Sequence, residues 1–238
     1  MFRTTARIYD LIYEAAGKDY VAESAELRQV IESHHPRAAS LLDVACGTGG
    51  HLRHLLAWYD VAGVDLDHAM LREARDRLTP AVPLVQADMR SFSLRRRFDA
   101  IVCLFSSIGY LPSVPDLETA IANMVNHLAP GGVLIIDGWV RPDAWRDPGS
   151  VHVVVAETPA LRVVRVSRSH REGRRTTLEM HHLVADQQSI QHLVDEHSLT
   201  LFAPTEYAAA LTRAGLSFHV LASPMADRDR YVAVRTHE

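Results

Sequence analysis

Residues 40–139 alternate short apolar runs, which suit β-strands, with amphipathic segments, which suit helices. Helical patterns lie at 49–58, 67–78 and 116–128, and LAPGG (128–132) predicts a helix end and a turn. Strands that alternate with helices form right-handed crossover units, so the region predicts a mostly parallel sheet with helices on both faces. The strand-like runs are SLLDVAC (40–46), VAGVDL (61–66), VPLVQA (82–87), FDAIVCLF (98–105) and GVLIIDGW (132–139).

The flanking segments have other patterns. Residues 1–36 predict two helices joined by a turn at GKDY, and four strand-like runs after Pro142 predict an antiparallel β meander. A helix at 205–214 and two strands, LSFHVLA and RYVAVR, should complete the first sheet. We therefore predict a helical cap (1–36), a core (37–141 and 203–238) and a β insertion (142–202) that covers the ligand-binding edge of the core.

Composition excludes several classes of protein. The net charge of −4 provides no basic field for nucleic acid. No apolar run is long enough to span a membrane, and the first ten residues lack the apolar segment of a signal peptide. Cys46, Cys103 and the 14 histidines show no metal-ligand spacing. We expect a cytoplasmic protein without a metal, a nucleic-acid partner or a membrane anchor.

The stretch LLDVACGTGGHLRHL (41–55) predicts a ligand-binding turn. Gly47 and Gly49 remove side chains where the backbone must turn and approach a ligand. A helix that begins near Thr48 would direct free N–H groups into the same space. Asp43 lies on the preceding strand, where its carboxylate can meet a polar part of the ligand.

Two further carboxylates follow the next two strands. Asp65 ends the second strand, where a carboxylate can accept both hydroxyls of a ribose. Asp88 follows the third strand and is placed to accept from an adenine amino group, with Met70 and Met89 as apolar contacts to the ring. Ligands of open α/β sheets bind at this edge, so an adenosine-containing ligand is expected, although each aspartate could instead cap a helix, as we expect of Asp67.

The identity of this ligand depends on a missing glycine. A dinucleotide fingerprint places a third glycine where this chain has Leu52. An acidic residue before the turn, Asp43, suits an ammonium group better than a pyrophosphate. The pattern therefore favours S-adenosylmethionine over NAD, and a non-catalytic or oxidoreductase-like NAD-binding protein is the alternative from another class.

With these motifs in view, the chain resembles the class I S-adenosylmethionine-dependent methyltransferases. The motifs are LLDVACGTG, GVDLDHAM, QADMRSF, FSSIGYL and LAPGGVLI. More narrowly, YDLIY, GKDY, VSRSHREG, EMHHLVA and LTLF make it similar to the dTDP-amino-deoxysugar N,N-dimethyltransferases of antibiotic biosynthesis. The resemblance implies a Rossmann-like α/β fold, mostly parallel with an antiparallel last strand, and in-line methyl transfer to a sugar amine.

The resemblance also implies site residues. Lys18, the only lysine, could form an ion pair with the methionine carboxylate or be a solvated turn residue. The expected cofactor contacts are Tyr9, Tyr20, Asp43, Ala45, Gly47, Asp65, Leu66, Met70, Asp88, Met89 and Leu104, with Tyr20 near that carboxylate.

The methyl acceptor should approach FSSIGYL (105–111), which follows the fourth strand. Tyr110 and His181 are the candidates for relaying the amine proton, although Tyr110 could be an aromatic anchor and His181 a solvated residue. Because an amine is already a good nucleophile, alignment should supply most of the rate. The expected substrate contacts are Tyr13, Ser107, Trp139, Arg171 and Arg228.

Some positions depart from the family pattern. A Pro-Trp-Trp-like run after the fifth strand is replaced by Gly138, Trp139 and Val140, and Asp65 stands in place of glutamate. A glycine-rich segment near the end is replaced by ADRDR, where Arg228 keeps only the basic element. A small-molecule hydroxyl or a non-sugar amine therefore stays open as the alternative acceptor. The open edges of the meander predict a homodimer.

Overall fold

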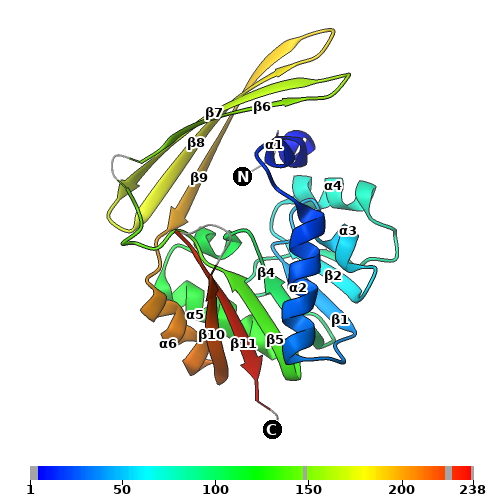
Figure 1. Cartoon of the computed structure of the whole chain (residues 1–238), viewed down its shortest axis with the longest axis vertical. Coiled ribbons are helices and arrows are strands. Elements are labelled where there is room, and N and C mark those ends of the chain that lie inside the picture. Colours follow the sequence, from blue (N-terminus) through cyan, green and yellow to red (C-terminus); the bar gives the residue numbers. More distant parts are fainter. Residues whose placement is uncertain (1–4, 147–148, 223–226, 237–238) are drawn as a thin grey trace.

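The computed structural model describes residues 5–146, 149–222 and 227–236, which form two sheets and their covering helices (Figure 1). The larger sheet has seven strands in the order β10-β11-β5-β4-β1-β2-β3. β11 runs antiparallel to β5 and β10, whereas β5, β4, β1, β2 and β3 are parallel. The smaller sheet is an antiparallel meander, β6-β7-β8-β9. The predicted fold class is confirmed.

The strands of the larger sheet are short, buried and rich in branched residues. Their bounds are β1 Ser40–Val44, β2 Asp60–Asp65, β3 Leu84–Gln86, β4 Phe98–Cys103, β5 Leu128–Asp137, β10 Leu216–Ala222 and β11 Asp229–Arg235. Both faces are covered, so alternate residues of one strand enter different cores. On β4, for example, Ile101 and Cys103 join one core while Ala100 and Val102 join the other.

Helices form the outer layers of this sheet. One face is covered by α2 (Tyr20–His34), α3 (Leu52–Leu55) and α4 (His68–Arg77), and the other by α5 (Val114–Asn126) and α6 (Pro204–Arg213). Asp67 caps α4 by accepting from the N–H of Ala69 and Met70, as expected. Asp19 caps α2 in the same way.

Two local predictions differ from the structure. The helix expected at 49–58 is shorter, since α3 spans only Leu52–Leu55. Gly49 has a left-handed φ of 73°, which excludes it from the start of the helix. The turn expected at LAPGG belongs to β5 instead, which begins at Leu128. The register against β4 shifts between Phe98 and Ala100, and Gly131 has a φ of 74°, so the glycines serve a β-bulge.

The smaller sheet stands above the carboxyl ends of the parallel strands (Figure 1). Its strands are β6 Val151–Glu157, β7 Arg162–Glu172, β8 Arg175–Ala185 and β9 Ile190–Thr200. The short η1 (Ala6–Ile8) and α1 (Tyr9–Ala15) lie beneath it, where Ile8 and Ile12 pack against Ala156, Val163 and Val184. The sheet and α1 thus place side chains over the edge where the sequence predicts the ligand.

Candidate active site

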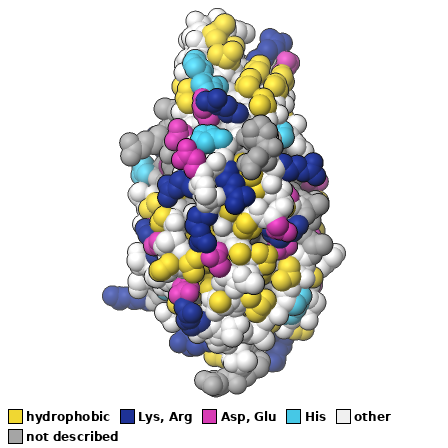
Figure 2. Space-filling model, turned by 90° about the vertical axis from the view of Figure 1, so that its left-hand side faces the viewer, with side chains coloured by type: hydrophobic (Ala, Val, Ile, Leu, Met, Phe, Trp, Pro, Cys, Tyr) yellow, Lys and Arg dark blue, Asp and Glu magenta, His cyan; other side chains and the backbone are white. Residues whose placement is uncertain are grey.

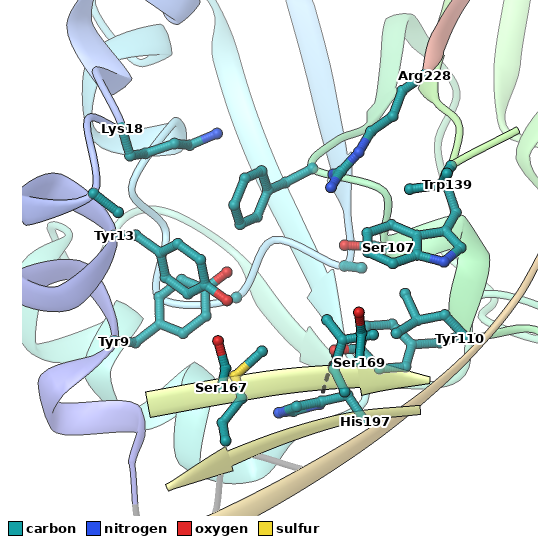
Figure 3. A pocket seen from close by; sticks show the side chains of 18 of the residues that line it. Tyr9, Tyr13, Lys18, Ser107, Tyr110, Trp139, Ser167, Ser169, His197 and Arg228 are labelled. Atoms are coloured by element: carbon teal, nitrogen blue, oxygen red, sulfur yellow. Dashed lines mark hydrogen bonds between the residues drawn. The ribbon is translucent and has the colours of Figure 1, made fainter. Parts of the chain in front are cut away.

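A cavity of about 1640 Å³ lies between the carboxyl ends of the parallel strands and the smaller sheet (Figure 3). Many of the expected site residues line it: Tyr9, Tyr13, Ala45, Gly47, Asp65, Leu66, Met70, Asp88, Met89, Ser107, Tyr110, Trp139 and Arg228. Five expected residues are not among its described lining: Tyr20, Asp43, Leu104, Arg171 and His181. The cavity exceeds the roughly 300–1,000 Å³ of an ordinary small-molecule pocket, so it has room for two ligands side by side.

The turn after β1 opens the cavity floor. Ala45 and Gly47 both have left-handed φ values, 63° and 55°. A Cβ built on Gly47 would meet no atom within 4 Å, so this glycine faces open space. A Cβ on Gly50 would lie 2.6 Å from the ring of Tyr20, so that glycine admits a supporting aromatic ring. The glycines therefore serve ligand approach at Gly47 and helix packing at Gly50.

Asp65, at the end of β2, is fixed by two backbone donors. The Gly47 N–H donates to Oδ2 and the Asp67 N–H donates to Oδ1, each at 2.8 Å. Burial raises the pKa of the Asp65 carboxyl. A carboxylate held this way keeps free lone pairs that can accept a pair of neighbouring hydroxyls.

Asp88, which lines the cavity, is held by an arginine. Its carboxylate accepts from Arg90 Nε and Nη2, at 3.0 and 2.6 Å, and Arg90 also bonds Asp116 at 2.7 Å. These hydrogen bonds from Arg90 lower the pKa of the Asp88 carboxyl. Asp88 therefore lines the cavity as a carboxylate held in a fixed orientation. The half-buried Met89 and the buried Met70 line the same cavity.

Lys18 points into the cavity and is not the solvated lysine that we considered (Figure 3). Its side chain is only 7% exposed, and Nζ lies 2.6 Å from Glu23 Oε2 and 4.0 Å from the centre of the Phe105 ring. His51 Nε2 lies 2.9 Å from the same Glu23 oxygen. Lys18, held by Glu23, therefore places a fixed ammonium group in the cavity.

Three expected cofactor contacts lie behind the cavity wall. The Tyr20 hydroxyl donates to Asp10, which also accepts from Thr48, both at 2.8 Å. Asp43 is 2% exposed, and burial raises the pKa of its carboxyl well above the usual value. Leu104 is 5% exposed and packs in the core. Of these residues, Tyr20 lies against the turn, because its ring contacts Gly50.

The loop after β4 is held in an unusual conformation. Phe105 and Ser106 both have left-handed φ values, 53° and 63°, which costs on the order of 1–3 kcal/mol for each such residue. The Phe105 N–H donates to Asp137 Oδ2 at 3.1 Å, and the Ser106 hydroxyl donates to the Gly138 carbonyl at 2.7 Å. Arg228 donates to Ser106 Oγ at 3.0 Å. These bonds present η2 (Ser107–Tyr110) to the cavity.

The inner face of the smaller sheet places polar residues in the cavity that the sequence analysis missed. Arg165, Ser167, Ser169 and His197 line the cavity. The first three occur at every second position of β7, and this alternation was a signal that could have found them. Arg165 is 8% exposed and lies 4.9 Å from the centre of the Tyr13 ring.

Trp139 and Arg228 form the wall opposite Lys18 (Figure 3). The Trp139 indole N–H donates to Thr176 at 3.0 Å, and the Arg228 guanidinium lies 4.3 Å from the centre of its ring. Burial lowers the pKa of Arg228. Lys18, Arg165 and Arg228 thus line the cavity with cationic side chains from three separate segments of the chain.

Two expected residues lie elsewhere. His181 projects from β8 on the outer face of the smaller sheet, where it contacts Glu179 at 2.6 Å and His192 at 2.9 Å. Arg171 donates to the carbonyls of Gly173 and Pro142. The structure therefore does not bring His181 to residues 105–111, which we call the acceptor loop. Arg171 instead holds the start of the insertion in place.

The described residues contain no group of three or more His, Cys, Asp or Glu side chains placed to hold a metal ion. In the same part of the chain, no helix is long and apolar enough to cross a membrane.

Comparison with known proteins decides the family. Residues 41–132 match a methyltransferase domain family. The chain is 44% identical over 231 residues to dTDP-3-amino-3,4,6-trideoxy-alpha-D-glucopyranose N,N-dimethyltransferase of Streptomyces venezuelae, covering 96% of this chain and 97% of that protein. The chain belongs to the family of S-adenosylmethionine-dependent dTDP-amino-sugar N,N-dimethyltransferases.

Further relatives agree across nearly the whole chain. dTDP-4-amino-2,3,4,6-tetradeoxy-D-glucose N,N-dimethyltransferase of Saccharopolyspora spinosa is 41% identical, over 97% of this chain and 92% of that protein. The crystal structure of Streptomyces venezuelae DesVI superposes with a TM-score of 0.92 at 43% identity, covering 97% and 98% of the two chains. An amino pentose methyltransferase from Micromonospora echinaspora, solved with S-adenosylmethionine bound, gives 0.87 at 40% identity, covering 96% and 97%.

The cavity of this methyltransferase fits its cofactor. The open position at Gly47, the oriented carboxylate of Asp65 and the apolar Met70 and Met89 suit the adenosine half. The buried cation of Lys18 suits a carboxylate at the amino-acid end. The enzyme uses S-adenosylmethionine, as the sequence analysis predicts.

Proposed function

We propose that this enzyme methylates the amino group of a dTDP-linked amino-deoxysugar twice, in the biosynthesis of an antibiotic sugar. The observation that carries the proposal is an identity of 41–45%, over 89–97% of this chain, to three enzymes named for such substrates. This similarity continues through the smaller sheet that roofs the cavity, and it favours a sugar amine over a hydroxyl or a non-sugar amine. The cavity volume supports it, since a nucleotide sugar and a cofactor must fit together.

Residue roles follow from position in the cavity. We propose that Asp65 binds the ribose, that the segment of Leu66, Asp88 and Met89 holds the adenine, and that Lys18 pairs with the methionine carboxylate. At the other end, Arg228 and Arg141 face the same space and suit a diphosphate. Tyr13, Ser107 and Trp139 line the same cavity and would enclose the sugar (Figure 3).

Positioning explains how this arrangement acts. When bound, S-adenosylmethionine supplies a methyl group on a positively charged sulfur that a nitrogen lone pair can attack in line. The protein residues hold the amine at the acceptor loop, and the smaller sheet covers the cavity in which the two ligands meet. A free amine needs no strong base, so the proton can leave to water after transfer.

Tyr110→Phe should lower kcat by about ten- to a hundredfold, because it removes one orienting hydroxyl and leaves alignment otherwise intact. Steady-state kinetics with confirmed cofactor binding measure the effect. Complete loss of turnover in a folded, cofactor-binding variant would show that Tyr110 does more than orient the amine.

Removing the nucleotide from the substrate tests the acceptor class. Loss of charge-assisted hydrogen bonds to a diphosphate should lower kcat/KM for the free amino sugar by at least about a hundredfold relative to its dTDP form. The comparison is made with one sugar in both forms at equal cofactor concentration. Equal kcat/KM values would contradict a nucleotide-linked substrate.

We also propose that the enzyme is a cytoplasmic homodimer whose smaller sheets face each other. The free thiols of Cys46 and Cys103 support a reducing compartment. The outer face of the smaller sheet supports the dimer, because it exposes many apolar side chains: Val151, Val153, Val155, Val166, Leu183, Ile190 and Val194. Figure 2 shows hydrophobic side chains gathered at the end of the molecule that this sheet occupies.

Leu183→Glu places a charge on this apolar face and should convert a dimer to a monomer, since the interface would then bury an unpaired charge. Light scattering during size-exclusion chromatography measures the mass. Val220→Glu, at a 48% exposed residue of β10 in the other sheet, is the matched control. A native monomer, or a dimer that survives Leu183→Glu, would overturn this interface.

A further inference from the structure

The acceptor loop makes one side-chain contact with the smaller sheet that no role described above uses. The Tyr110 hydroxyl lies 2.9 Å from Nδ1 of His197, a residue of β9 that is 87 positions away in the chain (Figure 3). The two rings meet edge to face with centroids 5.9 Å apart. His197 is 2% exposed and lines the cavity beside Tyr110.

Both members of this pair are uncharged at neutral pH. Burial lowers the pKa of His197 to about 4, and burial raises the pKa of the Tyr110 hydroxyl. A neutral imidazole carries one ring nitrogen that accepts a hydrogen bond. The pair can therefore hold the hydroxyl proton without either group titrating in the working range.

The chemistry of an amine restricts how a neighbouring hydroxyl can help. The nitrogen lone pair must face the transferred methyl group, so a hydroxyl that donates to the nitrogen would occupy the orbital that reacts. A hydroxyl oxygen that accepts an amine N–H leaves the lone pair free and fixes its direction. Tyr110 can help in this way only if its own proton is held elsewhere.

We propose that His197 is a positioning residue whose Nδ1 accepts a hydrogen bond from the Tyr110 hydroxyl. The Tyr110 oxygen is then free to accept a hydrogen bond from an N–H of the substrate amine in both methylations. The inference rests on the proposed function. A primary amine has two N–H groups, either of which can bind Tyr110. The monomethylated amine has one, so the second methylation depends more strongly on this acceptor. Each transfer first gives an ammonium ion whose extra proton leaves to water, and the neutral tertiary amine that results has no N–H for Tyr110.

Variants at His197 separate this role from simple packing. His197→Leu removes the acceptor, His197→Asn places an amide close to the position of Nδ1, and His197→Gln places it close to Nε2. His170→Leu, at an exposed histidine on the outer face of β7, is the matched control. Circular dichroism and calorimetric binding of S-adenosylmethionine verify the fold of each variant. Unmethylated and monomethylated sugars are then assayed separately.

The expected result is a selective loss of the second step. His197→Leu should lower kcat on the monomethylated sugar about tenfold, with a smaller effect on the unmethylated sugar and little change in KM, so that monomethylated product accumulates. His197→Asn should restore most of the rate, whereas His197→Gln should not. In a Tyr110→Phe background, His197→Leu should cause no further loss of kcat on the monomethylated sugar.

Other outcomes overturn the role. Equal losses on both substrates, equal rates for the Asn and Gln variants, or losses that multiply in the double variant would each show a packing role. If His197→Leu does not fold, the contrast between Asn and Gln decides. A native enzyme that methylates neither sugar would instead overturn the proposed function and this role with it.

Discussion

Asp65→Ala should weaken binding of S-adenosylmethionine by at least about a hundredfold. The change removes a carboxylate placed to accept two ribose hydroxyls, and hydrogen bonds to charged groups contribute about 1.5–3 kcal/mol each. It also releases the N–H of Gly47, which this carboxylate holds in the turn at 2.8 Å. Isothermal titration calorimetry measures the dissociation constant directly.

Asp60→Ala is the matched control, because Asp60 begins the same strand at the opposite edge of the sheet and is exposed. It should bind the cofactor with native affinity. An Asp65→Ala variant that is folded and also keeps native affinity would show that the ribose lies elsewhere in the cavity.

Arg230→Met should lower the free energy of unfolding by about 3 kcal/mol. Arg230 is 4% exposed and donates to Asp137 at 2.7 Å and to Glu26 at 2.9 Å. Breaking a buried ion pair from one side leaves the other charge uncompensated in a poorly solvated site. Asp137 also holds the left-handed turn at Phe105, so the loss should reach the acceptor loop. Urea unfolding followed by circular dichroism measures the change.

A second substitution distinguishes charge from packing. Adding Asp137→Asn to Arg230→Met removes the uncompensated charge and should recover part of the stability. Arg96→Met, which breaks an exposed pair with Asp60, should change the free energy by less than about 1 kcal/mol. If the double variant is no more stable than Arg230→Met alone, the lost energy came from packing.

The larger sheet and its ligand-binding edge could be predicted because their signals are local. Asp65 stands at a strand end after a helical crossover, so its place at the carboxyl edge follows from the alternation of elements alone. The bulge in β5 could not be foreseen in this way, because LAPGG has the composition of a helix end and only pairing with β4 makes it a strand.

The inner face of the smaller sheet could not be identified from the sequence, for a physical reason. Its alternation shows two faces, but apolar residues such as Val166 and Leu183 occupy the outer face while Arg165 and His197 turn inward to the cavity. Apolar residues ordinarily mark the inner face. His181, which the family resemblance suggested, lies on the outer face, and His197 on the inner face contacts Tyr110 instead.

The most direct test of the proposed function is mass spectrometry of dTDP-linked 3-amino and 4-amino deoxysugars incubated with the enzyme and S-adenosylmethionine. We expect at least one sugar to gain one methyl group and then a second, on nitrogen, with formation of the demethylated cofactor. No mass gain with any amino sugar, together with turnover of a hydroxyl acceptor, would contradict it.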